Sequence, residues 1–91
     1  PNLIFDIDVL VNKCIKENSA LAQNRSIKIK YINPLQCNIF ADETRLRRVI
    51  GNLINNGLSH ASKNTEFTIN IQKQHDKLIF NFTNIGNPIP E

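Results

Sequence analysis

The chain has 91 residues, which is enough for one small domain with a modest hydrophobic core. Its hydrophobic fraction of 41% and charged fraction of 21% are ordinary for a globular protein and do not indicate intrinsic disorder. Every apolar run falls short of the roughly 20 residues that cross a bilayer, and the first residues lack the basic start of a signal peptide. The composition therefore indicates a soluble domain.

Two cysteines, Cys14 and Cys37, stand apart from each other and from any histidine, so a disulfide framework or a zinc site has little support. Two reduced cysteines fit a cytoplasmic setting. The net charge of +3 is mildly basic, and Arg45, Arg47 and Arg48 lie within one helical turn. A nucleic acid could bind such a cluster, but no aromatic residue stands beside it for base stacking. A solvated helix face is the favoured interpretation.

The first half of the chain alternates between helix and strand patterns. Apolar residues recur at helical spacing from Asp6 to about Asn24 and predict one amphipathic helix. Residues 26–32 alternate strictly between apolar and polar side chains, which predicts a half-buried strand that ends in a turn at residues 33–34. Residues 36–40 are expected to form a short extended segment.

The second half carries the strongest periodicity of the sequence. Asp42 is a natural N-cap, and the apolar residues after it recur over about four turns, which predicts a long helix that ends near residues 62–64. Residues 65–72 and 78–84 alternate again and predict an antiparallel hairpin. The order of elements indicates an α+β fold, a two-layer α/β sandwich with helices packed on one face of a mixed, mostly antiparallel sheet.

A strip of polar residues follows the predicted long helix. At about 100° per residue, Asn52, Asn56, Ser59 and His60 fall along the edge of the predicted buried face, whereas Asn55 points to the solvent side. Asparagine is a mediocre helix former, so three of them in so short a stretch ask for a reason. The simplest explanation is that they are ordinary surface asparagines. The alternative is a ligand site, because such neutral donors and acceptors suit a hydrated Mg²⁺ and phosphate oxygens.

The segment ADETRLRRVIGNLINNGLSHA, residues 41–61, resembles the N-box of the histidine-kinase ATP-binding domain. The upstream order also fits this family, with a helix at FDIDVLV and a strand at SIKIKY. Downstream, FTNIGNPIPE stands where the family has its first glycine box, D-x-G-x-G-I. Two boxes in the expected order and on the expected elements are more specific than either alone, and the resemblance covers nearly the whole chain.

The resemblance implies a truncated Bergerat fold of the GHKL type, with ATP and Mg²⁺ as cofactors. By position, Asn56 would be the Mg²⁺ ligand, and Asn52 would line the phosphate site where related hydrolysing ATPases carry a glutamate that activates water. An amide cannot take that proton, so phosphate transfer to a histidine is favoured over hydrolysis. Ser59 stands where many members have a phosphate-contacting lysine, and His60 would face the phosphates.

The glycine box departs further from the family pattern. Asn84 replaces the aspartate that reads the adenine amino group, and Pro88 replaces the second glycine. The amide oxygen of Asn84 still accepts from that amino group, but with roughly half the strength of a charge-assisted bond. Gly86 keeps the place where the lack of a Cβ lets the backbone approach the base, although a plain turn glycine is the simpler reading of that residue alone.

The resemblance also implies sequence motifs of the kinase that residues 1–91 do not contain. We expect residues 1–91 to be a partial ATP-binding domain, with the ATP lid and second glycine box after Glu91, the phosphoacceptor histidine before Pro1, and no catalytic residue in between. The full-length protein would be a protein histidine kinase of a two-component system, with this part in the cytoplasm and a membrane anchor elsewhere. Its partners would be its own dimerisation domain and a response regulator, and not nucleic acid. An uncovered sheet edge predicts that residues 1–91 alone form a homodimer.

A second interpretation of the same resemblance is a degenerate kinase-like module that docks a partner without catalysis. Ser59, Asn84 and Pro88, which depart from the family pattern, favour it.

Residues 1–91 alone are expected to bind ATP weakly or not at all, because the segments that would enclose the nucleotide lie outside them. Isothermal titration calorimetry of this segment measures the affinity. A low-micromolar dissociation constant would contradict the expectation.

Overall fold

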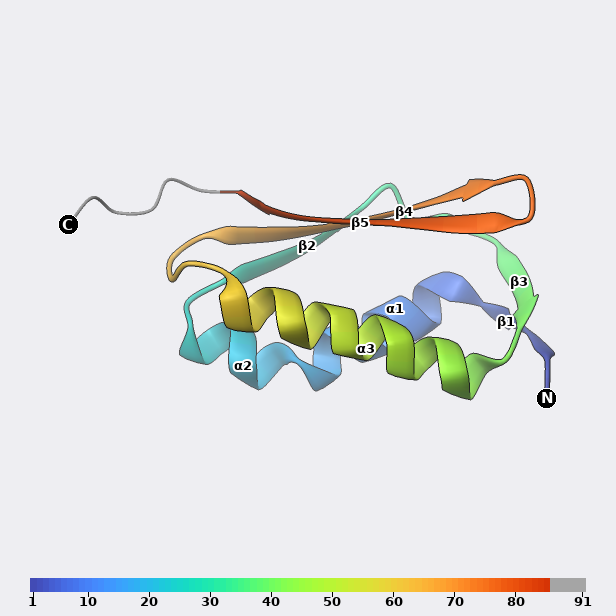
Figure 1. Ribbon diagram of the computed structural model, residues 1–91, viewed down its shortest axis with the longest axis horizontal. Coiled ribbons are helices and arrows are strands. Elements are labelled where there is room, and N and C mark those ends of the chain that lie inside the picture. Colours follow the sequence, from blue (N-terminus) through green and yellow to red (C-terminus); the bar gives the residue numbers. More distant parts are fainter. Residues whose placement is uncertain (86–91) are drawn as a thin grey trace.

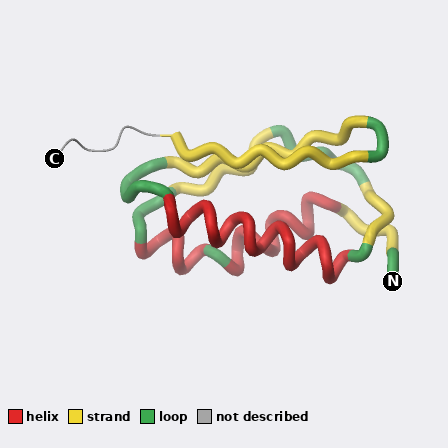
Figure 2. The backbone as a smooth tube through the Cα atoms, in the orientation of Figure 1, coloured by secondary structure: helices red, strands yellow, loops and turns green. Residues whose placement is uncertain are grey.

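The computed structural model describes residues 1–85, which form a layer of helices beneath one face of a sheet (Figures 1 and 2). This confirms the predicted α+β sandwich. Within this range, no helix combines the length and the apolar character needed to cross a membrane. The elements in chain order are β1 (Leu3–Asp6), α1 (Ile7–Glu17), α2 (Ser19–Asn24), β2 (Lys28–Ile32), β3 (Asn38–Ala41), α3 (Glu43–His60), β4 (Glu66–Gln74) and β5 (Lys77–Ile85).

The strands pair as a mixed, mostly antiparallel set. β4 is the central strand of the larger sheet, with β2 parallel to it on one side and β5 antiparallel on the other. The predicted hairpin is confirmed, and its strands run further than the alternating pattern, up to a turn at His75 and Asp76. β1 and β3 pair antiparallel in a separate small sheet at the end of the molecule where the N-terminus lies (Figure 1).

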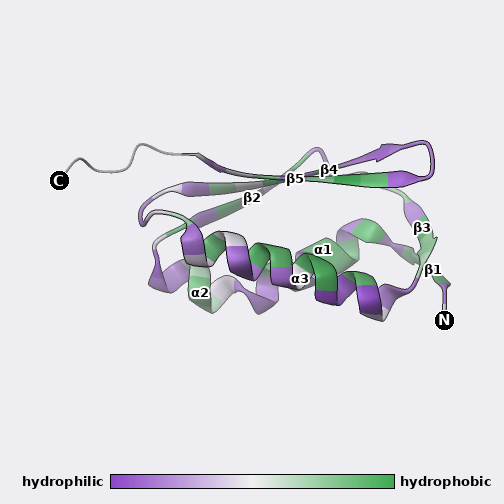
Figure 3. Ribbon diagram, viewed as in Figure 1, coloured by the Kyte–Doolittle hydropathy of each residue, from purple (hydrophilic) through white to green (hydrophobic). Residues whose placement is uncertain are grey.

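The core lies between the helices and the larger sheet. Figure 3 shows hydrophobic residues, coloured green, along α1 and α3 and along the strands above them. From α3, Ile50, Ile54 and Leu58 are completely buried, and each such side chain stabilises the fold by roughly 1.5–3 kcal/mol. The buried apolar residues are Ile7, Leu10, Val11, Cys14, Ala22, Ile27, Ile50, Ile54, Leu58, Ala61, Phe67, Ile69 and Ile71.

The prediction of one helix from Asp6 to about Asn24 is wrong in its middle, where Asn18 separates α1 from α2. The backbone N–H of Asn18 donates to the carbonyls of Cys14 and Ile15 at 3.2 and 3.1 Å. Its side-chain Nδ2 also donates to the carbonyl of Cys14, at 2.9 Å. The backbone bond to Cys14 is still the α-helical one, but the bond to Ile15 takes the carbonyl that the N–H of residue 19 would use in a continuing helix, so α1 ends here.

The sequence pattern does not predict β1, which has only four residues and no alternation of burial. Leu3 and Ile4 are both exposed, and the strand exists because β3 supplies its hydrogen-bond partners. The carboxylate of Asp6 then caps α1 by accepting from the backbone N–H groups of Asp8 and Val9 at 2.8 and 3.4 Å.

Asp8 holds the connection between β2 and β3. One carboxylate oxygen accepts from the hydroxyl of Tyr31 at 2.5 Å and from the backbone N–H of Leu35 at 3.1 Å. The other accepts from the N–H of Gln36 at 2.7 Å, which supports the unusual φ of 54° at this residue. Burial, followed by the hydrogen bond to Asp8, raises the pKa of Tyr31, so its hydroxyl stays protonated and keeps donating at neutral pH.

Gly57 of α3 lies against Phe67 of β4. A Cβ built on Gly57 would lie 2.6 Å from the Cε1 and Cζ atoms of Phe67. The ring of Phe67 has little room to move, because it is 3% exposed and stacks on Phe82 with ring centroids 5.9 Å apart. Gly51, in the same helix, has no such neighbour within 4 Å of its Cβ position.

Gly57→Ala is expected to be less stable than Gly51→Ala by about 1–3 kcal/mol, the usual cost of overpacking. The two variants are matched, because each gains the same helix propensity of about 1 kcal/mol and only one new methyl group meets the Phe67 ring. Urea denaturation of both variants measures the difference. Equal free energies of unfolding would contradict the tight contact.

Candidate functional site

α3 presents two sides with different surroundings. Ile50, Ile54 and Leu58 face the core, whereas Asn52 and Asn56 are exposed and lie one turn apart on the other side of the helix. Within residues 1–85, neither of these two side-chain amides has a hydrogen-bond partner. Both are therefore available to a ligand.

A shallow hollow of about 580 Å³ lies over this side of α3. The prediction that the polar strip runs along the edge of the buried face is wrong, because Val49 and Leu53 beside it are 44% and 39% exposed. Free amides next to half-exposed apolar side chains make a surface that suits a ligand with polar and apolar parts. The residues that line the hollow are Val49, Asn52, Leu53, Asn55 and Asn56.

The other two predicted residues of the strip turn back onto the backbone of α3. The hydroxyl of Ser59 donates to the carbonyl of Asn55 at 2.9 Å. Nδ1 of His60 lies 2.8 Å from the carbonyl oxygen of Asn56, which only accepts, so this nitrogen carries a proton. In the neutral ring Nε2 is then an acceptor, and His60 could donate to a phosphate from Nε2 only after protonation.

Asn84 lies on the same face of the sheet as α3. It is directly opposite Phe67 in the hairpin of β4 and β5, and opposite side chains of an antiparallel pair project from the same face. Phe67 packs on Gly57, the residue that follows Asn56 in α3. The structure therefore places α3, which carries Asn56, and the side chain of Asn84 on the same side of the sheet.

The amide nitrogen of Asn84 is fully used within the protein. It donates to the hydroxyl oxygen of Thr65 at 2.7 Å and to the carbonyl of Glu66 at 3.0 Å. The amide oxygen is left for a ligand, as an acceptor. Gly86, the other predicted site residue of this box, and Pro88 lie outside the described residues.

The family model of histidine kinase-, DNA gyrase B- and HSP90-like ATPases matches residues 41–91. This segment is more than half of the chain and contains α3 with both free amides and β5 with Asn84. The chain belongs to this family. The resemblance drawn from the two boxes is confirmed, and membership of this ATPase family implies ATP as the nucleotide.

Similar proteins agree with this assignment. Sensor protein CzcS of Cupriavidus metallidurans is 30% identical over 73 residues, which are 80% of this chain and 15% of CzcS. The nucleotide-free catalytic domain of histidine kinase ThkA matches the whole chain with a TM-score of 0.79 and 22% identity, and the chain covers 63% of it. ThkA in complex with the response regulator TrrA matches 99% of the chain and 27% of the ThkA chain, with a TM-score of 0.78 and 23% identity. The fold is thus that of histidine kinase catalytic domains.

The N-box pattern that residues 41–61 resemble, N-L-I-x-N-A, has alanine where residues 52–57 of this chain, NLINNG, have Gly57. Here the ring of Phe67 occupies the space that an alanine methyl group would need.

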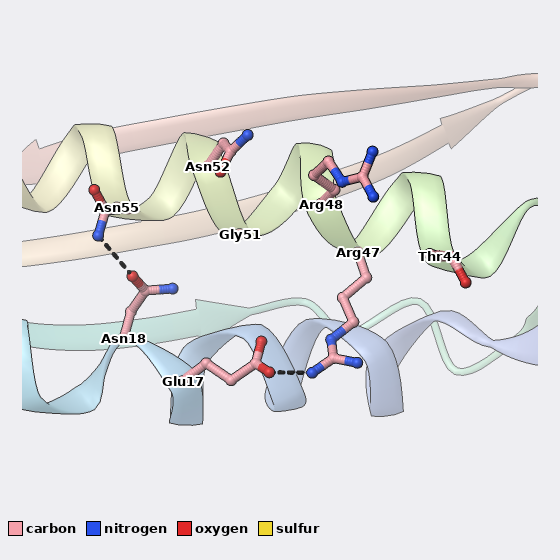
Figure 4. A pocket seen from close by; sticks show the side chains of 8 residues that line it. All are labelled: Glu17, Asn18, Thr44, Arg47, Arg48, Gly51, Asn52 and Asn55. Carbon is pink, nitrogen blue, oxygen red and sulfur yellow. Dashed lines mark hydrogen bonds and ion pairs between the residues drawn. The ribbon is translucent and has the colours of Figure 1, made fainter.

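A second hollow of about 410 Å³ lies between α3 and the junction of α1 and α2 (Figure 4). Asn55 is exposed as predicted, but its Nδ2 also donates to Oδ1 of Asn18 at 3.3 Å. The pattern analysis missed Asn18, whose only signal was a polar residue at a buried helical position. The lining residues are Glu17, Asn18, Thr44, Arg47, Arg48, Gly51, Asn52 and Asn55.

The three arginines of α3 do not act as one patch. Arg47 reaches across to α1, where it forms an ion pair with Glu17, and Arg48 points away from it (Figure 4). Within residues 1–85, Arg45 and Arg48 form no ion pair. The arrangement agrees with the favoured interpretation of a solvated helix face.

The ion pair gives a prediction for pH dependence. The hydrogen bond from Arg47 lowers the pKa of Glu17, so the pair contributes stability above the unfolded-state pKa of about 4.3 and loses it as pH falls through the lower folded value. NMR titration of the Glu17 carboxyl carbon is expected to show this lowered pKa, and Arg47→Gln is expected to return it to the ordinary range. An unchanged midpoint in the variant would contradict the pairing.

Proposed function

We propose that the chain is the ATP-binding part of a sensor histidine kinase, which transfers the γ-phosphate of Mg-ATP to a histidine in a separate dimerisation domain. The observation that carries the proposal is the pair of unpartnered amides, Asn52 and Asn56, on the exposed side of α3 and on the same side of the sheet as Asn84. The family assignment supports ATP as the nucleotide. The name of CzcS supports a sensor protein, and the name of histidine kinase ThkA supports the kinase branch of the family.

Asn56 would hold Mg²⁺ through its side-chain oxygen. Magnesium keeps several waters and needs only one or two protein oxygens when phosphate oxygens complete its shell. Asn56 fits this role because its side chain is exposed and has no partner in the part of the chain that the structure describes. In that same part, no group of three or more His, Cys, Asp or Glu residues could hold a metal ion. Bound Mg²⁺ would neutralise charge on the phosphates.

Asn52 would line the phosphates without activating water. Its amide is neutral and does not accept a proton at neutral pH, so it offers hydrogen bonds but no general base. Ser59 brings no positive charge to a position where many members have a lysine, and its hydroxyl proton is already donated to the helix backbone. Nδ1 of His60 is likewise engaged with the helix backbone, at the carbonyl of Asn56. The amide of Asn52 is the free donor among these residues, and it favours binding and orientation of ATP over its hydrolysis.

The partners follow from the same proposal. The full-length protein would pass the phosphate through its own dimerisation and phosphoacceptor domain to a response regulator, and the complex of ThkA with its response regulator supports the second step. This part would lie in the cytoplasm, with a membrane anchor elsewhere in the protein. Nucleic acid is not a proposed partner. The segment alone would be inactive and would form a homodimer through the uncovered edge of its sheet.

A degenerate kinase-like docking module is the alternative function. The neutral residues Ser59 and Asn84 favour it, because both weaken the charge complementarity of a nucleotide site relative to the family pattern. Trans-phosphorylation by the full-length protein separates the two functions, since a docking module transfers no phosphate.

Asn56→Ala in the full-length protein is expected to lower Mg²⁺-dependent autophosphorylation by at least about tenfold, because metal charge stabilisation contributes several kcal/mol to such a transition state. Asn12→Ala is the matched control: it removes an exposed amide from α1 and is expected to leave the rate unchanged. Radiolabelled phosphate transfer from ATP measures both variants. Equal rates in the two would contradict the role of Asn56.

A further inference from the structure

Asn84 is exposed, but its side-chain nitrogen contacts two acceptors, the hydroxyl oxygen of Thr65 and the carbonyl oxygen of Glu66, which together form what we call the socket. Its Nδ2 points at the hydroxyl oxygen of Thr65, 2.7 Å away, and at the carbonyl oxygen of Glu66, 3.0 Å away. A carbonyl oxygen accepts and never donates, so the contact with Glu66 requires an N–H from residue 84.

The hydroxyl of Thr65 is committed as well. Its one proton is donated to the carbonyl of Ser62 at 2.6 Å, so its oxygen is left to accept from Asn84. Thr65 is only 7% exposed, and its own carbonyl accepts from the backbone N–H of Lys28 at 3.1 Å. This residue is therefore anchored from three sides, and it cannot turn its hydroxyl toward Asn84 without leaving the carbonyl of Ser62 unpaired.

The hydrogen-bond network thus allows one orientation of the Asn84 amide. With nitrogen inward, each contact joins a donor to an acceptor. With the amide reversed, the oxygen of Asn84 would face the carbonyl of Glu66, and two acceptors would repel. The amide oxygen of Asn84 is consequently turned away from the socket.

We propose that Thr65 is a positioning residue which, together with the carbonyl of Glu66, fixes the amide oxygen of Asn84 outward, so that position 84 accepts only a hydrogen-bond donor from the nucleotide base. This inference rests on the proposed nucleotide site. It predicts selection of a base with an exocyclic amino group, such as adenine, against a base with a keto oxygen at the same place, such as hypoxanthine.

The socket also explains how this chain uses asparagine where the family pattern has aspartate. A carboxylate at position 84 would place oxygen against the acceptors of Thr65 and Glu66. The surroundings of residue 84 are therefore built for an amide, and aspartate is the wrong residue in this context even though the family pattern carries it.

The test compares ATP with ITP, which differ at this group of the base, in the full-length protein. Wild type is expected to bind ATP at least about tenfold more tightly than ITP, since a keto oxygen would face the fixed amide oxygen. Thr65→Val removes the shorter of the two contacts at constant shape, so that only the 3.0 Å contact with the carbonyl of Glu66 still orients the amide of this exposed residue, and it is expected to reduce this ratio to about threefold or less. Thr65→Ser keeps the hydroxyl and is expected to restore the wild-type ratio.

Two further measurements complete the test. Asn84→Asp is expected to weaken ATP binding, and the side-chain N–H protons of Asn84, observed by NMR with ¹⁵N-asparagine, are expected to exchange slowly in wild type and quickly in Thr65→Val. Tighter ATP binding by Asn84→Asp, or equal affinities of wild type for ATP and ITP, would overturn the inference and leave the proposed function standing. Binding of neither nucleotide would overturn both, and slow exchange would then show the socket without a nucleotide role.

Discussion

The close contact between Gly57 and the ring of Phe67 sets how near α3 comes to the sheet, and the candidate site depends on that distance. The ring lies 2.6 Å from the position that a Cβ of residue 57 would take, so the helix backbone rests directly on the Phe67 ring of β4. Phe82 continues the stacked rings onto β5, and Asn84 is the next residue on the same face of that strand. A bulkier residue at 57 would move the amides of α3 away from Asn84.

The periodicity of the sequence predicted those elements whose formation is decided by burial. α3, β4 and β5 were predicted close to their observed bounds, because most of their apolar residues face one core. The break at Asn18 could not be predicted from apolar spacing, since it depends on the hydrogen bonds of a single polar residue with the last turn of α1. β1 depends on pairing with β3, which lies beyond two helices and another strand, and local pattern does not report such pairing.

The candidate site, like the fold, could be predicted from the sequence only in part. Helical geometry alone put Asn52 and Asn56 on one side of α3. It did not reveal that Val49 and Leu53 beside them are half exposed, because exposure depends on which elements cover the helix. The positioning role of Thr65 could not be predicted from the sequence, because it depends on hydrogen bonds with both Ser62 and Asn84. Asn84 comes within reach of Thr65 only when β5 pairs with β4.

The parallel pairing of β2 with β4 sets the order in which the chain can assemble. The hairpin of β4 and β5 closes through a two-residue turn, and α3 precedes it directly, so these three elements form contacts between neighbours in the chain. β2 and β4 are separated in the chain by β3 and α3, so their parallel pairing requires closure of a much longer loop. We therefore expect the folding nucleus to lie in the segment from α3 to β5, and that segment holds Asn52, Asn56 and Asn84.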